Sequence, residues 1–105
     1  MSKPKWHGSK WIRPEKRRRL YKRDAFRCVY CEQGVEHGVM LTLDHITPRE
    51  LGGGNEATNL VTACRSCNSA KRDLPLTSFI TYLADAGVDT DGIARRVRNS
   101  RRRKY

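Results

Sequence analysis

The sequence lacks any apolar run that approaches the ~20 residues of a membrane-spanning helix. Its basic first residues are not followed by an apolar segment of the kind that a secretory signal contains. We therefore expect no membrane partner and no export, and we expect the chain to work in a reducing cytoplasm. In that compartment, cysteine pairs are more often metal ligands than disulfides.

Acidic residues are absent from 95–105 and nearly absent from 1–23. Residues 1–23 hold ten Lys or Arg and one acid, a net charge of +9, and residues 95–105 hold seven Lys or Arg, a net charge of +7. The stretch 24–94 holds five basic and ten acidic residues, a net charge of −5. This distribution predicts a compact central unit between two basic arms. Such arms favour a nucleic-acid partner, because they release counterions from a polyanion; the alternative is a pair of solvated tails without a partner.

Apolar residues are also scarce, at 37% of the 105 residues, while 31% are charged. The chain is therefore long enough for one domain with a modest core. If the ends are tails, the folded remainder falls in the size range where a core alone supplies about 3–5 kcal/mol. We therefore expect an additional stabilising cross-link, and the four cysteines are the obvious candidates to form it.

The pattern of apolar residues predicts an α+β fold in which two strands form an antiparallel hairpin with a long connection. The strands are expected at 39–46 and 59–62, after a short strand at 26–31 that enters a metal knuckle. Helices are expected over 15–25, 64–72 and 76–84, with Thr90 or Asp91 capping a last one.

We divide the chain into three parts. Residues 1–23 are a basic N-terminal arm with the start of a helix, residues 24–74 are the core with the cysteine pairs, and residues 75–105 are a helical extension with a basic tail. Trp6 and Trp11 suit either contact with nucleic acid or packing on the core.

Two short cysteine motifs predict a structural zinc site. Cys28-x-x-Cys31 and Cys64-x-x-Cys67 are separated by 32 residues and use all four cysteines of the chain. Two such knuckles together provide the tetrahedral set of four sulfurs that zinc prefers, with no open position for catalysis. Buried free thiols and disulfides are the alternatives.

A group of polar residues lies between and beside the two knuckles: Asp44, His45, Asn59 and Asn68. A histidine can act as a base near neutral pH, because its ordinary pKa is about 6.5. A carboxylate and an amide oxygen can hold a hard cation such as Mg²⁺. Neighbours on a strand point to opposite faces, so we expect a bulge or twist just before Pro48 to bring Asp44 and His45 together.

The order Cys-x-x-Cys, Leu-Asp-His-Ile-x-Pro, Gly-Gly, Asn-Leu and Cys-x-x-Cys-Asn-x-x-Lys closely resembles the HNH endonuclease family. In this chain these motifs are Cys28–Cys31, Leu43–Pro48, Gly52–Gly53, Asn59–Leu60 and Cys64–Lys71. The resemblance covers roughly residues 26–72, about half of the chain. It implies the ββα-metal fold and a metal-dependent endonuclease that hydrolyses DNA phosphodiester bonds, by nicking or by double-strand cleavage.

The resemblance also implies a role for each polar residue. His45 matches the general base that activates water, and Asp44 matches the acidic neighbour that binds the catalytic cation. Asn59 matches the middle signature position, which orders the loop and helps orient the base. Asn68 matches the third position, where many members carry histidine, so the chain is a His-Asn-Asn variant. The four cysteines match the structural zinc ligands of the zinc-bearing branch.

The mechanism implied by these roles begins when His45 takes a proton from water, which attacks the phosphorus in line. A cation on Asp44 and Asn68 then stabilises the departing 3′ oxygen, and the products carry 5′-phosphate and 3′-hydroxyl ends. Because an amide oxygen is a harder donor than imidazole, we expect Mg²⁺ or Mn²⁺ at this site.

Several cations are candidates for contact with nucleic acid, although ordinary surface cations are an alternative for the first three. They are Lys71, Arg49, Arg65, Arg17, Arg18 and Arg102. Small proteins of this shape resemble those of phages, some of which work beside the packaging terminase. The resemblance implies a large terminase subunit or another phage protein as a candidate partner and, for a phage protein, the host cytoplasm as the location. A zinc-ribbon-like nucleic-acid-binding module without catalysis is the alternative function; it explains the charge and the cysteines but not the four polar residues.

Overall fold

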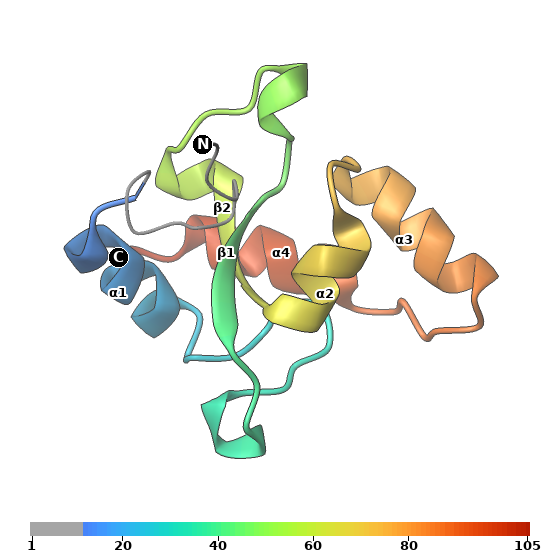
Figure 1. The fold of residues 1–105 in the computed structure, drawn as a ribbon, viewed down its shortest axis with the longest axis horizontal. Coiled ribbons are helices and arrows are strands. Elements are labelled where there is room, and N and C mark those ends of the chain that lie inside the picture. The colour runs from blue at the N-terminus through green and yellow to red at the C-terminus, as the bar shows by residue number, and fades with distance from the viewer. Residues whose placement is uncertain (1–11) are drawn as a thin grey trace, which may run out of the picture.

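A two-stranded antiparallel sheet lies at the centre of the computed structural model, which describes residues 12–105 (Figure 1). Strand β1 (Leu41–His45) pairs with β2 (Leu60–Cys64), in a register that runs from Leu41 opposite Cys64 to His45 opposite Leu60. The predicted α+β class and the antiparallel hairpin are confirmed. The second strand begins at Leu60 and not at Asn59, because Asn59 ends a short 3₁₀ turn.

Within residues 12–105, four α-helices surround this sheet: α1 (Pro14–Arg23), α2 (Arg65–Lys71), α3 (Leu76–Asp85) and α4 (Ile93–Arg102). Helices α1 and α4 pack against β2, and α2 packs against both strands. Figure 1 shows α3 on the opposite side of the sheet from α1. Three 3₁₀ turns lie in the connections, at Val35–His37, Arg49–Leu51 and Ala57–Asn59. No helix among residues 12–105 is long and apolar enough to cross a membrane.

Some element boundaries differ from those predicted. The strand expected at 26–31 is wrong: only an isolated bridge between Arg27 and Gly34 forms there. Ala25 and Phe26 both have positive φ angles, which end α1 early and turn the chain sharply into the first cysteine pair. The last helix begins after Gly92, whose φ is 91°, and not after Thr90 or Asp91. Trp6 and Trp11 lie outside the described residues.

The core consists of two clusters on either side of β2, a strand that is buried along its whole length. The larger one joins the first cysteine pair, β2, α3 and α4, and contains Cys28, Val29, Tyr30, Ile46, Val61, Ala63, Cys64, Phe79, Ile93 and Val97. The smaller one joins α1 to both strands and contains Ile12, Leu20, Leu43 and Leu60. On α3, Phe79 is fully buried but Ala84 is exposed, so the predicted apolar face is narrower than its spacing suggests.

A buried polar network connects the end of α1 and helix α4 to the sheet. The Asp24 carboxylate accepts hydrogen bonds from the Arg23 guanidinium, from the Thr62 backbone N–H and from the Ser100 hydroxyl on α4. Arg23 also donates to the carbonyl oxygen of Leu60 at 2.6 Å. Helices α1 and α4, which carry much of the basic charge of the two arms, are therefore integral parts of the fold.

Candidate functional site

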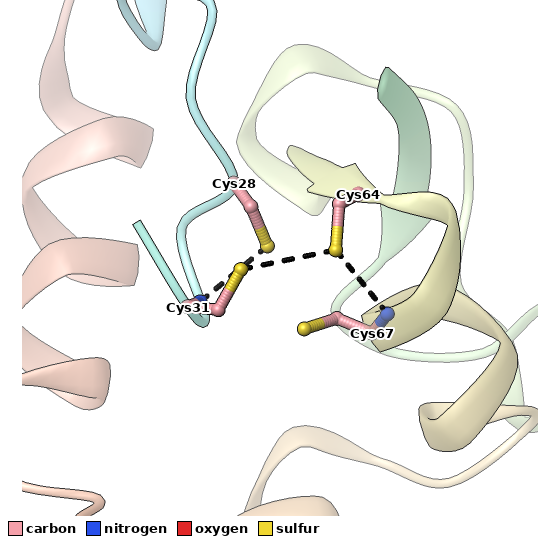
Figure 2. A group of neighbouring side chains, drawn as sticks. All are labelled: Cys28, Cys31, Cys64 and Cys67. Atoms are coloured by element: carbon pink, nitrogen blue, oxygen red, sulfur yellow. Dashed lines mark hydrogen bonds between the residues drawn. The ribbon is translucent and has the colours of Figure 1, made fainter. Parts of the chain in front are cut away.

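The four cysteines converge from separate elements of the fold (Figure 2). Cys28 and Cys31 form the first knuckle, before β1, and Cys64 and Cys67 form the second knuckle, from the end of β2 into α2. Their sulfurs all lie within 4.8 Å of one another, and Cys31 Sγ lies 3.8 Å from Cys64 Sγ. Zn–S bonds of ~2.3 Å in a tetrahedron place the sulfurs about 3.8 Å apart. This four-cysteine cluster could therefore hold a metal ion such as zinc.

The backbone of each knuckle also favours thiolates. Cys28 Sγ accepts hydrogen bonds from the N–H groups of Tyr30 and Cys31, and Cys64 Sγ accepts one from Cys67. A hydrogen bond from Cys67 lowers the pKa of Cys28 to about 5, although burial opposes this. The pKa of Cys67 is raised by that same hydrogen bond, and burial raises the pKa of Cys31 to about 11. One thiolate therefore hinders ionisation of its neighbours, and a divalent cation would remove this penalty.

His45, the last residue of β1, is held by the long connection between the strands, residues 46–59. Its Nε2 lies 2.8 Å from Asn55 Oδ1. An amide oxygen only accepts hydrogen bonds, so Nε2 carries the proton and Nδ1 is the basic nitrogen of the neutral ring. The carbonyl oxygen of Asn55 in turn accepts a hydrogen bond of 2.7 Å from Lys16 on α1.

Asn59 ties the two ends of this connection together. Its Oδ1 accepts a hydrogen bond from the Thr47 N–H at 2.9 Å, and its Nδ2 donates to the carbonyl oxygens of Thr47 and Gly54. A Cβ atom at Gly53 would lie 1.8 Å from the Thr47 carbonyl oxygen, so this close approach requires glycine. Asn59 therefore orders the loop that carries Asn55.

Asp44 points to the other face of β1 and is buried, with 4% of its surface exposed. Its Oδ2 accepts a hydrogen bond of 2.5 Å from the Tyr30 hydroxyl and lies 3.2 Å from Lys71 Nζ. Burial raises the pKa of Asp44, and the positive charge of Lys71 only partly offsets this. The pKa of Tyr30 is likewise raised, mainly by burial and then by the negative charge of Asp44.

Asn68 lies on α2, next to β1. Its Nδ2 donates hydrogen bonds to Thr42 Oγ1 at 2.9 Å and to the Leu43 carbonyl oxygen at 3.1 Å. These contacts use the amino group and fix the amide, whose oxygen remains an acceptor suited to a hard cation.

The comparisons with known proteins identify the middle of the chain. Residues 28–74 match the model of the family described as HNH endonuclease. This segment is an HNH endonuclease domain. The match includes both knuckles, His45, Asn59 and Asn68, and the two strands followed by α2 are consistent with the ββα-metal fold. No curated protein was found that matches the chain.

A solved structure agrees with the fold of the HNH domain. The crystal structure of the Type II-C Cas9 enzyme from Actinomyces naeslundii matches with a TM-score of 0.63 and 24% sequence identity. The match covers 85% of this chain but only 9% of the Cas9 chain. It therefore supports the fold beyond the boundaries of the HNH domain, and it says nothing by itself about substrate.

The HNH domain does not contain the bulge expected before Pro48. Pairing of the strands continues without interruption to His45 opposite Leu60, and Ile46 then donates to the Asn59 carbonyl oxygen at 2.9 Å. Asp44 and His45 consequently contact different elements, the first knuckle and the long connection.

Lys71 was expected to contact phosphate from the surface, and this must be corrected. The side chain is fully buried, and Nζ donates to the His45 carbonyl oxygen at 2.7 Å besides lying near Asp44. The other candidate cations of the HNH domain, Arg49 and Arg65, are exposed. Outside it, Arg18 and Arg102 are exposed, whereas Arg17 is half-buried and donates to the Tyr21 hydroxyl.

Two hydrogen bonds of the HNH domain were not identified from the sequence: the one between Asn55 and His45, and the one from Tyr30 to Asp44. The signals that could have indicated them are weak. Asn55 directly follows three glycines in the long connection, and Tyr30 is one of the two residues inside the first knuckle. His37 is exposed, and its Nδ1 accepts a hydrogen bond from the Gly34 N–H.

Proposed function

We propose that the chain is a divalent-cation-dependent DNA endonuclease in which His45 is the general base. One observation carries this proposal: in an HNH domain, the imidazole of His45 is fixed by Asn55 so that Nδ1 is the basic nitrogen. A base whose tautomer is fixed can accept a proton without first reorganising.

The proposed reaction is hydrolysis of a phosphodiester bond. His45 accepts a proton from water at Nδ1, and the oxygen of that water forms a bond to phosphorus. The bond from phosphorus to the 3′ oxygen breaks, and this oxygen takes up a proton. The products carry 5′-phosphate and 3′-hydroxyl ends. Asn55 and Asn59 keep the base and its loop in place while the proton moves.

The chemistry of Asp44 and Asn68 fits a hard divalent cation, for which we propose Mg²⁺ or Mn²⁺. A carboxylate and an amide oxygen are the ligands such cations prefer. Asp44 receives only long contacts from Lys71, at 3.2 and 3.4 Å, so its charge is incompletely compensated. When bound, the cation would supply positive charge to the phosphate and to the departing oxygen. Because Asp44 and His45 point to opposite faces of β1, the phosphate would have to lie across the end of that strand to meet both the cation and the base. We propose Zn²⁺ for the four-cysteine cluster, as a structural ion.

DNA is the proposed substrate because the exposed basic side chains suit a polyanion. They include Arg18 on α1 and Arg102 at the end of α4. Contacts of this kind bind the backbone and carry no sequence information, so we expect little sequence specificity in the isolated chain. A partner would then direct cleavage, and a large terminase subunit remains a prediction of the sequence.

The test is a nicking assay on supercoiled plasmid with zinc-loaded protein, with and without Mg²⁺ or Mn²⁺. We expect relaxation of the plasmid only when the cation is added. His45→Ala should abolish this, since a general base contributes roughly 10²–10⁴-fold. Asn55→Ala should reduce it, and Asn55→Asp should be more active than Asn55→Ala, because a carboxylate oxygen can also accept a hydrogen bond from His45 Nε2–H.

Zinc content must be measured beside activity, because a chelator that removes Mg²⁺ can also extract zinc. Dialysis that keeps one zinc per chain, followed by addition of Mg²⁺, separates the two effects. Equal relaxation by wild type and His45→Ala would contradict the proposal. A protein that binds DNA and keeps zinc but never cuts would instead be the zinc-ribbon-like binding module.

A further inference from the structure

Tyr30 connects the four-cysteine cluster to the carboxylate proposed for the catalytic cation. It lies inside the first knuckle, and the N–H groups of Tyr30 and Cys31 both donate to Cys28 Sγ. Its hydroxyl reaches across the fold to Asp44 Oδ2 at 2.5 Å. The residue that shapes the zinc knuckle is thus also the residue that holds Asp44.

The Tyr30 side chain is buried and packed against a second ring, which limits the freedom of its hydroxyl. The ring is buried, with 5% of the residue exposed, and it packs edge-on against Phe79 with centroids 5.2 Å apart. The backbone is held as well, because Arg96 on α4 donates to the carbonyl oxygens of Val29 and Tyr30. A hydroxyl held this firmly can orient a carboxylate.

The second knuckle contributes a second contact to the same carboxylate. Helix α2 begins directly after Cys64, whose sulfur caps it, and ends at Lys71, whose ammonium group lies 3.2 Å from Asp44 Oδ2. Both halves of the four-cysteine cluster therefore extend to Asp44, one through Tyr30 and the other through α2.

We propose that Tyr30 is a positioning residue through which the zinc-loaded first knuckle prepares Asp44 for the catalytic cation. This inference rests on the proposed function. The O–H group of Tyr30 stabilises the ionised carboxylate in a buried place and fixes which of its lone pairs remain for a cation. Zinc then has a second consequence besides folding, because the ion that organises the first knuckle also determines where Asp44 lies.

The test compares Tyr30→Phe with Tyr82→Phe in the full, zinc-loaded chain. Both variants lose one phenol hydroxyl from a ring beside Phe79, but Tyr82 is exposed and has its hydroxyl in no described hydrogen bond. Three quantities are measured: zinc per chain, Mn²⁺ affinity by paramagnetic resonance, and the Mn²⁺ concentration that gives half-maximal nicking.

We expect Tyr30→Phe to keep one zinc per chain and an unchanged fold. Its Mn²⁺ affinity should fall by roughly 10–100-fold, as for other groups that orient a metal ligand. The Mn²⁺ requirement of nicking should rise by a similar factor, and saturating Mn²⁺ should restore most of the rate. Tyr82→Phe should equal wild type in all three measurements. A purely structural role would not produce a defect that added cation repairs.

The outcomes separate this inference from the proposed function. If wild type binds Mn²⁺ and nicks, and Tyr30→Phe matches it, the inference is overturned while the function stands. A Tyr30→Phe protein that loses zinc or unfolds also overturns it, since the hydroxyl would then support the knuckle and not the cation. If wild type neither binds Mn²⁺ nor nicks, the function fails and this inference fails with it.

Discussion

Two buried aspartates, Asp24 and Asp44, occupy comparable depths in this small protein but are held in very different ways. Each Asp24 oxygen accepts two hydrogen bonds: Oδ1 from Arg23 and Ser100, and Oδ2 from Arg23 and Thr62. Asp44 has one short hydrogen bond from Tyr30 and only long contacts with Lys71. A fully satisfied carboxylate holds the fold together, whereas an incompletely satisfied one retains the capacity to bind something else.

The partners of the two carboxylates also come from different parts of the fold. Asp24 joins α1, β2 and α4, and its hydrogen bonds come from Arg23, Thr62 and Ser100, none of which lies in a knuckle. Asp44 is held from the two knuckles, so its environment depends on the four-cysteine cluster. The comparison teaches that burial alone does not distinguish a structural carboxylate from a functional one; the number and strength of its hydrogen bonds do.

Removal of zinc should have the largest effect, and it tests whether the two regions can be separated. The larger core cluster includes Cys28 and Cys64, and binding energies at such sites are about 10–16 kcal/mol. We expect Cys67→Ser to lose zinc and to unfold at room temperature, as measured by circular dichroism and metal analysis. If the Thr62 amide stays protected from hydrogen exchange without zinc, the Asp24 region folds independently, which would contradict this expectation.

Asp24→Asn should have the next largest effect, on stability alone. The change leaves the buried Arg23 guanidinium without its ionic partner, and breaking a buried pair costs about 3–5 kcal/mol. Urea denaturation of zinc-loaded protein measures this loss. Asp85→Asn, at an exposed position at the end of α3, is the matched control and should change stability by less than about 0.5 kcal/mol.

The comparison also explains which features the sequence could predict. The cysteine spacing and the order of the motifs indicated the four-cysteine cluster and the HNH domain, because those signals are local. The Asp24 network depends on Ser100, 76 residues away, and no local pattern specifies that contact. Lys71 was mistaken for a surface cation because a lysine on a short helix is usually exposed, and only the folded chain places it over Asp44.

Asp44→Asn should differ from Asp24→Asn in both respects: it should lose less stability, and it should lose cleavage completely. The change also leaves a buried cation, Lys71, without its ionic partner, but the contacts between Lys71 and Asp44 are long, at 3.2 and 3.4 Å, whereas both Asp24 oxygens accept hydrogen bonds from a guanidinium. The amide oxygen of asparagine can still accept from Tyr30, and Lys71 keeps its hydrogen bond to the His45 carbonyl oxygen. We expect the free energy of unfolding to fall by less than in Asp24→Asn, while nicking disappears because the cation loses its charged ligand. If Asp44→Asn is the less stable of the two variants, the distinction between the carboxylates is wrong.

The smallest expected effect, and the most specific one, is a difference between wild type and Asp44→Asn in how stability depends on pH. Burial raises the pKa of Asp44, so the folded chain binds its proton more tightly than the unfolded chain does. The stability that this gives is complete below the unfolded pKa of about 3.9, and it is lost as pH rises through the folded pKa. In buffers without Mg²⁺, wild type should therefore lose stability relative to Asp44→Asn as pH rises through the folded pKa of Asp44, with zinc per chain measured for both proteins at each pH. Urea denaturation at several pH values measures the difference, and parallel curves would mean that Lys71 and Tyr30 compensate Asp44 as fully as Arg23, Thr62 and Ser100 compensate Asp24.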